Sequence, residues 1–212
     1  MLTQTIPVLD LNDFQGGDAQ RRKFAAQVGQ ALEHLGFFAV VNHGVDAGLI
    51  RQAYQVAMEF FELPDATKQR YELPGLNGQR GFTAFGREHA KDSPYPDLKE
   101  FWHVGRELPA NHPQRSRYPA NVAVAELPEF HPSLAALYDQ LERCAATLLE
   151  ACTVYLGEPD PPLSEWIREG DTILRVIHYP PIPPEAAPAS LRSAPHEDIN
   201  LITLLCEATD DG

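Results

Sequence analysis

The sequence predicts an α+β domain in which helices come first and strands follow. Three amphipathic helical segments lie before Gly157, a loop-rich region separates the second from the third, and two apolar β-type segments follow Gly170. A chain that groups its helices and then its strands is typical of α+β architectures rather than of alternating α/β folds. We expect the sheet to be still incomplete where the chain reaches Gly212.

The first elements are a short strand, a helix and a second strand. "IPVLDL" at residues 6–11 alternates briefly, as a short strand does. Residues 18–35 carry apolar side chains at helical spacing, and Gly36 follows as the expected C-terminal cap. "FFAVV" at 37–41 is rich in β-formers and ends in the turn "NHG", in which we expect His43 to be structural.

Two further helices and a loop-rich region follow. A helical pattern runs from near Asp46 to just before Pro64, and a short helix is expected at residues 65–71. From residue 74 to residue 128 the periodicity fades, with short strands expected around Phe82 and Trp102. A long segment of this kind inside a compact domain is usually functional. Its charge-mixed part, "KDSPYPDLKE", is interpreted as the edge of a lid.

The longest helix comes next and the predicted strands close the chain. Apolar residues repeat at steps of three and four from Leu134 to Tyr155, a helix of about six turns that Gly157 ends. The segments 172–179 and 199–207 are β-branched and almost continuously apolar. This composition predicts strands that are covered on both faces.

Composition limits the classes of function. The 212 residues are 43% apolar and 22% charged, which suits one large globular domain. The net charge of −13 gives the chain no electrostatic reason to bind nucleic acid or an anionic membrane. Its three cysteines show no metal-site spacing and indicate a reducing compartment. With neither a signal peptide nor a membrane span in the sequence, we expect a cytoplasmic protein.

A His-x-Asp pair precedes the last predicted strand. On a strand His196 and Asp198 would share one face, about 6 to 7 Å apart along the backbone, with Glu197 turned away. Imidazole and carboxylate on one face suit a divalent metal, and a second histidine would complete the facial triad of non-haem Fe(II) oxygenases. A hydrogen-bonded surface pair is the simpler interpretation of two such residues alone.

Several ordered blocks together resemble a known family. They are "IPVLDL", "LGFFAVVNHGV" (35–45), "RGFTAFGRE" (80–88), "DLKEFWHVG" (97–105), "LRVIHYPP" (174–181) and "HEDINLITLL" (196–205). In this order they resemble the isopenicillin N synthase-like family of Fe(II)- and 2-oxoglutarate-dependent oxygenases, over essentially the whole chain.

The resemblance implies a fold and a set of site residues. The fold would be a double-stranded β-helix, or jelly-roll, with N-terminal and backing helices, truncated at its C-terminus. Residues 1–125 would form the family's N-terminal region, and residues 126–212 the backing helix and the first part of the catalytic core. His196 and Asp198 match the first two iron ligands, and Tyr179 matches a position that contacts the co-substrate or substrate carboxylate. The third ligand, a histidine, and an Arg-x-Ser pair that binds 2-oxoglutarate would come after Gly212.

The implied activity is oxidation of a small-molecule C–H bond with Fe(II), 2-oxoglutarate and O₂. We expect no catalytic residue beyond the metal ligands, and the sequence does not indicate an oligomeric state. Two alternatives stay open: an iron oxidase of the same family that does not use 2-oxoglutarate, and a truncated fragment without catalysis. The 212-residue chain by itself is expected to lack oxygenase activity.

Other polar residues near these blocks have simpler interpretations. His103 is expected either to line a substrate pocket or to pack in the interior. His178 alternates with Tyr179 and should therefore face away from the metal. Arg175 could reach the mouth of the cavity or form a structural salt bridge.

Overall fold

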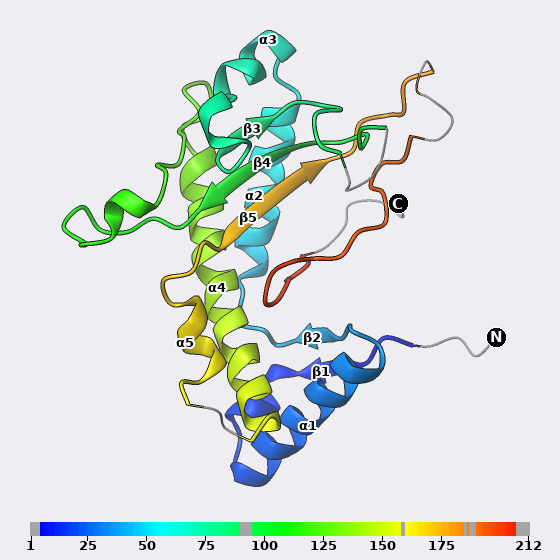
Figure 1. The fold of residues 1–212 in the computed structure, drawn as a ribbon, viewed down its shortest axis with the longest axis vertical. Coiled ribbons are helices and arrows are strands. Elements are labelled where there is room, and N and C mark those ends of the chain that lie inside the picture. Colours follow the sequence, from blue (N-terminus) through cyan, green and yellow to red (C-terminus); the bar gives the residue numbers. More distant parts are fainter. Residues whose placement is uncertain (1–4, 90–94, 158–159, 185, 187–189, 207–212) are drawn as a thin grey trace. The chain divides into compact units, whose positions relative to one another are not determined.

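A computed structural model describes residues 5–89, 95–157, 160–184, 186 and 190–206. The chain divides into two compact units, one of residues 1–46 and 139–170 and the other of residues 47–138 and 171–212. The long helix α4, Phe130–Tyr155, begins in the second unit and ends in the first (Figure 1).

The first unit pairs two short parallel strands with a long helix. Strand β1 (Val8–Asp10) lies beside β2 (Ala39–Val41), and helix α1 (Asp18–His34) comes between them in the sequence. The expected strand 6–11 is shorter than predicted because residues 11–15 form a 3-10 helix instead. The Asp10 carboxylate starts that helix by accepting the Asn12 backbone N–H at 2.9 Å.

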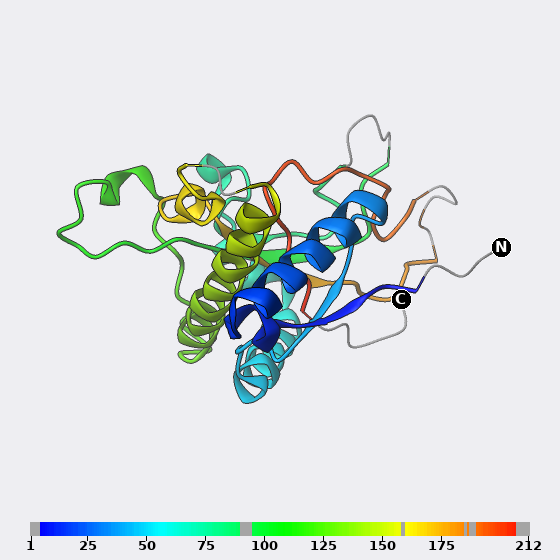
Figure 2. The ribbon, with the colours of Figure 1, turned by 90° about the horizontal axis from the view of Figure 1, so that it is seen from below.

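Helix α1 confirms the predicted helix and packs closely against the end of α4, as Figure 2 shows. A Cβ added at Gly29 would collide with the Tyr155 ring, so the small residue permits the close approach. Gly36, with φ of 78°, donates its N–H to Ala31 and Leu32 and ends the helix as the sequence predicts. The short helix α5, Leu163–Ile167, completes the unit.

The second unit is built on a three-stranded antiparallel sheet. Strand β4 (Glu100–Gly105) lies between β3 (Gly81–Thr83) and β5 (Ile173–His178). The expected strands around Phe82 and Trp102 are therefore confirmed, and these two residues face each other in the register of β3 and β4. The expected strand 172–179 is confirmed as β5.

Helix α2 (Ala47–Phe61) and the start of α4 cover one face of this sheet (Figure 1). The fully buried Phe60 of α2 contacts rings from β3, β4 and α4, which fixes the core between helices and sheet. The predicted helix 65–71 is present as α3 (Asp65–Lys68) and a following 3-10 turn (Gln69–Tyr71). Among the described residues, no helix is both long and apolar enough to cross a membrane.

Two expectations about the last strands are wrong for the described residues. Residues 199–206 form no strand, and Ile199 and Leu205 are exposed, Leu205 by 80%. Strand β5 is an edge of its sheet, with alternate side chains exposed, rather than a strand covered on both faces. The physical reason is that residues of high β-propensity form a strand only where a neighbouring strand pairs with them and other side chains cover them. Within the described chain no neighbouring strand pairs with 199–206, and residue 207 lies outside it.

Candidate metal centre

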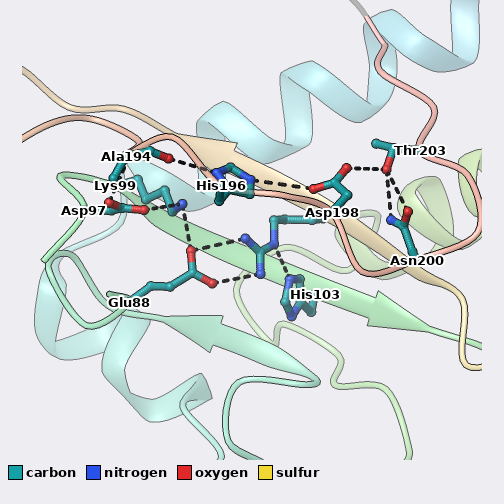
Figure 3. Close-up of polar contacts among 10 residues, drawn as sticks. Glu88, Asp97, Lys99, His103, Ala194, His196, Asp198, Asn200 and Thr203 are labelled. Atoms are coloured by element: carbon teal, nitrogen blue, oxygen red, sulfur yellow. Dashed lines mark hydrogen bonds and ion pairs between the residues drawn. The ribbon is translucent and has the colours of Figure 1, made fainter. Parts of the chain in front are cut away.

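The His-x-Asp pair lies on a loop that is tied to the segment before β4. The Leu98 backbone N–H donates to the Leu191 carbonyl at 2.9 Å, and the Ala194 N–H donates to the Asp97 carboxylate at 3.1 Å. These two bonds fix the loop two residues before His196 (Figure 3). The expected strand geometry is wrong here, because residues 196–198 have no strand conformation.

His196 and Asp198 nevertheless lie together. The His196 Nε2 and Asp198 Oδ1 atoms are 3.6 Å apart, which is too long for a hydrogen bond, and both side chains are about half exposed. Metal–nitrogen and metal–oxygen bonds of about 2.1 Å would place two ligands of one ion about 3 to 3.5 Å apart. The separation of these two atoms is therefore compatible with a shared divalent ion.

Outer contacts orient both side chains. His196 Nδ1 lies 2.9 Å from the Ala194 carbonyl, which can only accept, so Nδ1 carries a proton, and in the neutral form of the ring Nε2 presents its lone pair towards Asp198. The other oxygen of Asp198 accepts from the Thr203 hydroxyl at 2.5 Å, and the Asn200 amide donates to that hydroxyl at 2.9 Å. An imidazole whose Nδ1–H is held by a carbonyl, beside a hydrogen-bonded carboxylate, is the arrangement that a metal ligand pair requires.

Within the described chain, neither the predicted Tyr179 nor a third metal ligand joins this pair. Tyr179 follows β5 directly and is 38% exposed, and no hydrogen bond links it to His196 or Asp198 among the described residues. No group of three or more His, Cys, Asp or Glu side chains suited to a metal occurs in that part of the chain either. Within the described chain, the candidate site therefore offers one imidazole and one carboxylate.

A partly buried ionic cluster beside the loop was missed by sequence reasoning. Lys99 lies 2.8 Å from Asp97 and 2.7 Å from Glu88, and Glu88 also accepts two bonds from the Arg175 guanidinium, at 3.0 and 3.2 Å. Burial alone would raise the pKa of Glu88, but the bonds from Lys99 and Arg175 outweigh it and lower that pKa. We define these four residues as the Lys99 cluster.

The position of the Lys99 cluster corrects the interpretation of residues 91–100 as a lid edge. Asp97 and Lys99 are only 3% and 4% exposed, so this end of the segment belongs to the interior. Residues 91–94 lie outside the described residues. Arg175 forms the structural salt bridge that was one of its two interpretations.

The histidines near the sheet are structural. His103 is buried and packs in the interior, which was one of the two interpretations that the sequence left open. Its Nδ1 donates to the Gly78 carbonyl at 2.5 Å and its Nε2 accepts from Arg175 at 2.7 Å. His178 bonds Glu100 at 2.8 Å and stacks on Phe61, away from any metal role. In the first unit, His43 accepts the Val45 N–H in its turn, as predicted.

His103 gives the fold a dependence on pH. Burial, followed by the nearby Arg175 charge, lowers the pKa of His103 from 6.5 to about 4. Between those values the unfolded chain binds a proton that the folded chain does not, so stability is complete above pH 6.5 and falls as the pH drops towards 4. The loss at the low end is roughly 3 kcal/mol.

Urea unfolding at several pH values between 7.5 and 4 checks this expectation. The His103→Gln variant has no titrating group at this position and should show a flatter pH dependence than the wild type. Glu88, with its lowered pKa, adds a loss that begins only below about pH 4.5 and is common to both proteins. Parallel curves for the two proteins between pH 6.5 and 4.5 would contradict the assignment.

A surface pocket of about 560 Å³ lies in the first unit. Its lining includes Arg21, Arg22 and Tyr155 but no histidine or cysteine. It therefore offers no donor set for a transition metal, whereas His196 and Asp198, in the second unit, do.

Comparison with known proteins identifies the family. The family model described as "non-haem dioxygenase in morphine synthesis N-terminal" matches residues 6–126. The 2-oxoglutarate-dependent dioxygenase imqE of Aspergillus flavus is 30% identical over 94% of this chain and 62% of its own length. Gibberellin 20 oxidase 3 of Oryza sativa subsp. japonica is 33% identical over 94% of this chain and 52% of its own length.

Solved structures agree with this assignment. A 2OG-Fe(II) oxygenase family protein of Caulobacter crescentus superposes with a TM-score of 0.71 at 34% identity, over 85% of this chain and 58% of that one. A full-length protein of Neurospora crassa, solved in complex with alpha-KG, gives a TM-score of 0.71 at 25% identity, over 91% of this chain and 61% of that one. The chain therefore belongs to the Fe(II)- and 2-oxoglutarate-dependent oxygenase family. It spans about half to two thirds of the length of these relatives.

Proposed function

We propose that this chain is part of an Fe(II)- and 2-oxoglutarate-dependent oxygenase that oxidises a C–H bond of a small molecule. The single observation that carries the proposal is the approach of His196 Nε2 to Asp198 Oδ1, with the imidazole proton on the opposite nitrogen. The activity of the family supports the proposal. So does the Neurospora crassa protein, which was solved with alpha-KG alone and also with alpha-KG and the small molecule thymine. With a net charge of −13, neither nucleic acid nor an anionic membrane is a favoured partner.

Each residue has a distinct role in this proposal. His196 and Asp198 bind Fe(II), while the Ala194 carbonyl and the Thr203 hydroxyl orient them. When bound, Fe(II) with 2-oxoglutarate and O₂ supplies the oxidising chemistry. Tyr179 offers a hydroxyl donor to a carboxylate of the co-substrate or substrate.

We also propose the finer architecture that the family implies. Strand β5 belongs to a jelly-roll core that α4 backs, and β3 and β4 of the N-terminal region extend its sheet, in line with the mixed helices and sheets of the structure. In this scheme residues 1–125 are the N-terminal region, and residues 126–212 are the backing helix and the first part of the core.

Release of succinate from 2-oxoglutarate tests the activity. The complete protein, of which we propose that this chain is part, is purified and incubated with 2-oxoglutarate under air, with and without Fe(II), and succinate is quantified. We expect succinate only when Fe(II) is present. Oxygen consumption without loss of 2-oxoglutarate would instead identify an iron oxidase that does not use this co-substrate.

Replacing Tyr179 by phenylalanine should weaken binding of 2-oxoglutarate or substrate more than binding of metal. The change removes one hydrogen bond of about 1 to 3 kcal/mol, or roughly 5- to 150-fold in the binding constant. The KM for each small molecule is compared with the affinity for Mn(II). Tyr95→Phe, at a similarly exposed tyrosine (41%), is the matched control. Equal KM values in the wild type and the Tyr179 variant would remove Tyr179 from the site.

A further inference from the structure

A continuous path of hydrogen bonds joins the Lys99 cluster to the candidate metal ligand (Figure 3). Lys99 donates to one oxygen of Asp97 at 2.8 Å, and the Ala194 N–H donates to the other at 3.1 Å. The Ala194 carbonyl then accepts the Nδ1 proton of His196 at 2.9 Å. We propose that Asp97 is a positioning residue that fixes, through Ala194, the orientation and tautomer of the His196 imidazole. The inference rests on the proposed function insofar as His196 binds metal.

Asp97 is a rigid anchor because its surroundings are buried and fully bonded. Both Asp97 and its partner Lys99 are almost completely buried, so neither side chain competes with solvent for these bonds. The Asp97 backbone N–H donates to the Glu88 carbonyl at 2.9 Å, and the neighbouring Leu98 N–H donates to Leu191. Both the backbone and the side chain of Asp97 are therefore fixed by hydrogen bonds.

His196 itself lacks such support. Its side chain is 55% exposed, and packing alone leaves a half-exposed imidazole free to rotate. Its bond to the Ala194 carbonyl is what selects the Nδ1–H form and leaves Nε2 available. Anything that frees the Ala194 peptide should therefore also free the ring.

The two bonds of Asp97 require a carboxylate. One oxygen accepts from Lys99 and the other from the Ala194 N–H, so both sides of the group act as acceptors. An amide at this position has a single acceptor oxygen and must leave one of the two donors unpaired. Because a hydrogen bond from the charged Lys99 ammonium is stronger than one from a neutral peptide N–H, we expect the amide oxygen to face Lys99 and the Ala194 bond to be lost.

Asp97→Asn is the test variant and Glu88→Gln its matched control. Both remove one carboxylate from Lys99, but only Asp97 bonds the Ala194 peptide. Nitrogen-15 NMR of the metal-free proteins at one fixed pH reports the amide exchange of Ala194 and the tautomer of His196. We expect exchange about tenfold faster and a mixed tautomer population in Asp97→Asn, with wild-type values in Glu88→Gln.

Binding of Mn(II), followed by electron paramagnetic resonance, provides the second measurement. Loss of an outer contact to a ligating histidine typically weakens metal binding 10- to 100-fold, and we expect about 10-fold for Asp97→Asn. If His196→Ala binds Mn(II) as the wild type does, the metal site of the proposed function is wrong. The NMR measurements then still decide whether Asp97 orients His196.

Two results would overturn the positioning role. One is a folded Asp97→Asn protein with the wild-type exchange rate and tautomer; the other is an equal change in Glu88→Gln, which would assign the effect to the cluster as a whole. Should Asp97→Asn fail to fold, Ala194→Pro decides the matter, since it removes the N–H donor and fixes φ at this position but leaves every side chain of the Lys99 cluster unchanged. A wild-type His196 tautomer in that variant would equally refute the inference.

Discussion

In the complete protein, replacing His196 by alanine should abolish the Fe(II)-dependent release of succinate from 2-oxoglutarate. His196 supplies the only imidazole of the pair, and its Nε2 lies 3.6 Å from the Asp198 oxygen that would share the ion. Loss of an outer contact alone typically weakens a metal site 10- to 100-fold, so loss of a ligand should cost more than about 100-fold. Asp198→Asn removes the charged ligand and should have a similar effect.

Succinate release and bound metal are measured together, with iron added in excess. Glu197→Gln is the control, because Glu197 lies between the two ligands, is exposed and has no role in the proposed site. It should retain wild-type turnover. Wild-type succinate release by iron-supplemented His196→Ala would show that the ligands lie elsewhere in the protein.

The helices and the central strands could be predicted because their signals are local. Apolar side chains at steps of three and four mark α1, α2 and α4, and Gly36 marks the end of α1. These patterns depend only on which face of the element is buried, which neighbouring residues already determine. The short strands around Phe82 and Trp102 were recognisable for the same reason.

The conformation of residues 196–206 could not be predicted in this way. Its side chains suit a strand, but strand formation depends on a partner from another part of the chain. His196 and Asp198 still converge, for a different reason than strand alternation: the Ala194 carbonyl and the Thr203 hydroxyl turn them towards each other. The His-x-Asp pattern and the family resemblance therefore identified the residues, while hydrogen bonds within the loop set their geometry.

The Lys99 cluster was hidden because charged residues in a mixed segment resemble a solvated surface. Only pairing across the fold, of Asp97 with Ala194 and of Glu88 with Arg175, makes their burial possible. One sequence signal was available. In "DLKEFWHVG" the charges alternate directly into an aromatic strand, so Lys99 shares its parity with Phe101 and His103, and Glu100 shares its parity with Trp102. Charges on both faces of a buried strand require partners on both sides.

Replacing Phe60 by alanine should cost a large share of the folding stability, about 3 to 5 kcal/mol. Phe60 is fully buried, and its ring centroid lies 4.8 Å from that of Trp102 and 5.0 Å from that of Phe130. Alanine would remove these contacts and leave a cavity between helix and sheet that the surrounding rings can fill only in part. Natural domains have only about 5 to 15 kcal/mol of net stability, so the loss is a large fraction of the total.

Unfolding in urea measures the effect, with Met58→Ala as the control on the same helix. Met58 is 58% exposed, and its replacement should change the free energy of unfolding by no more than about 0.5 kcal/mol. Since methionine and alanine both favour helices, the comparison isolates the buried contacts from helix propensity. We expect the Phe60 variant to unfold at a much lower urea concentration with an unchanged slope, as for a change in stability alone. If the free energy of unfolding falls equally little in both variants, the rings around Phe60 contribute less to stability than their packing in the structure indicates.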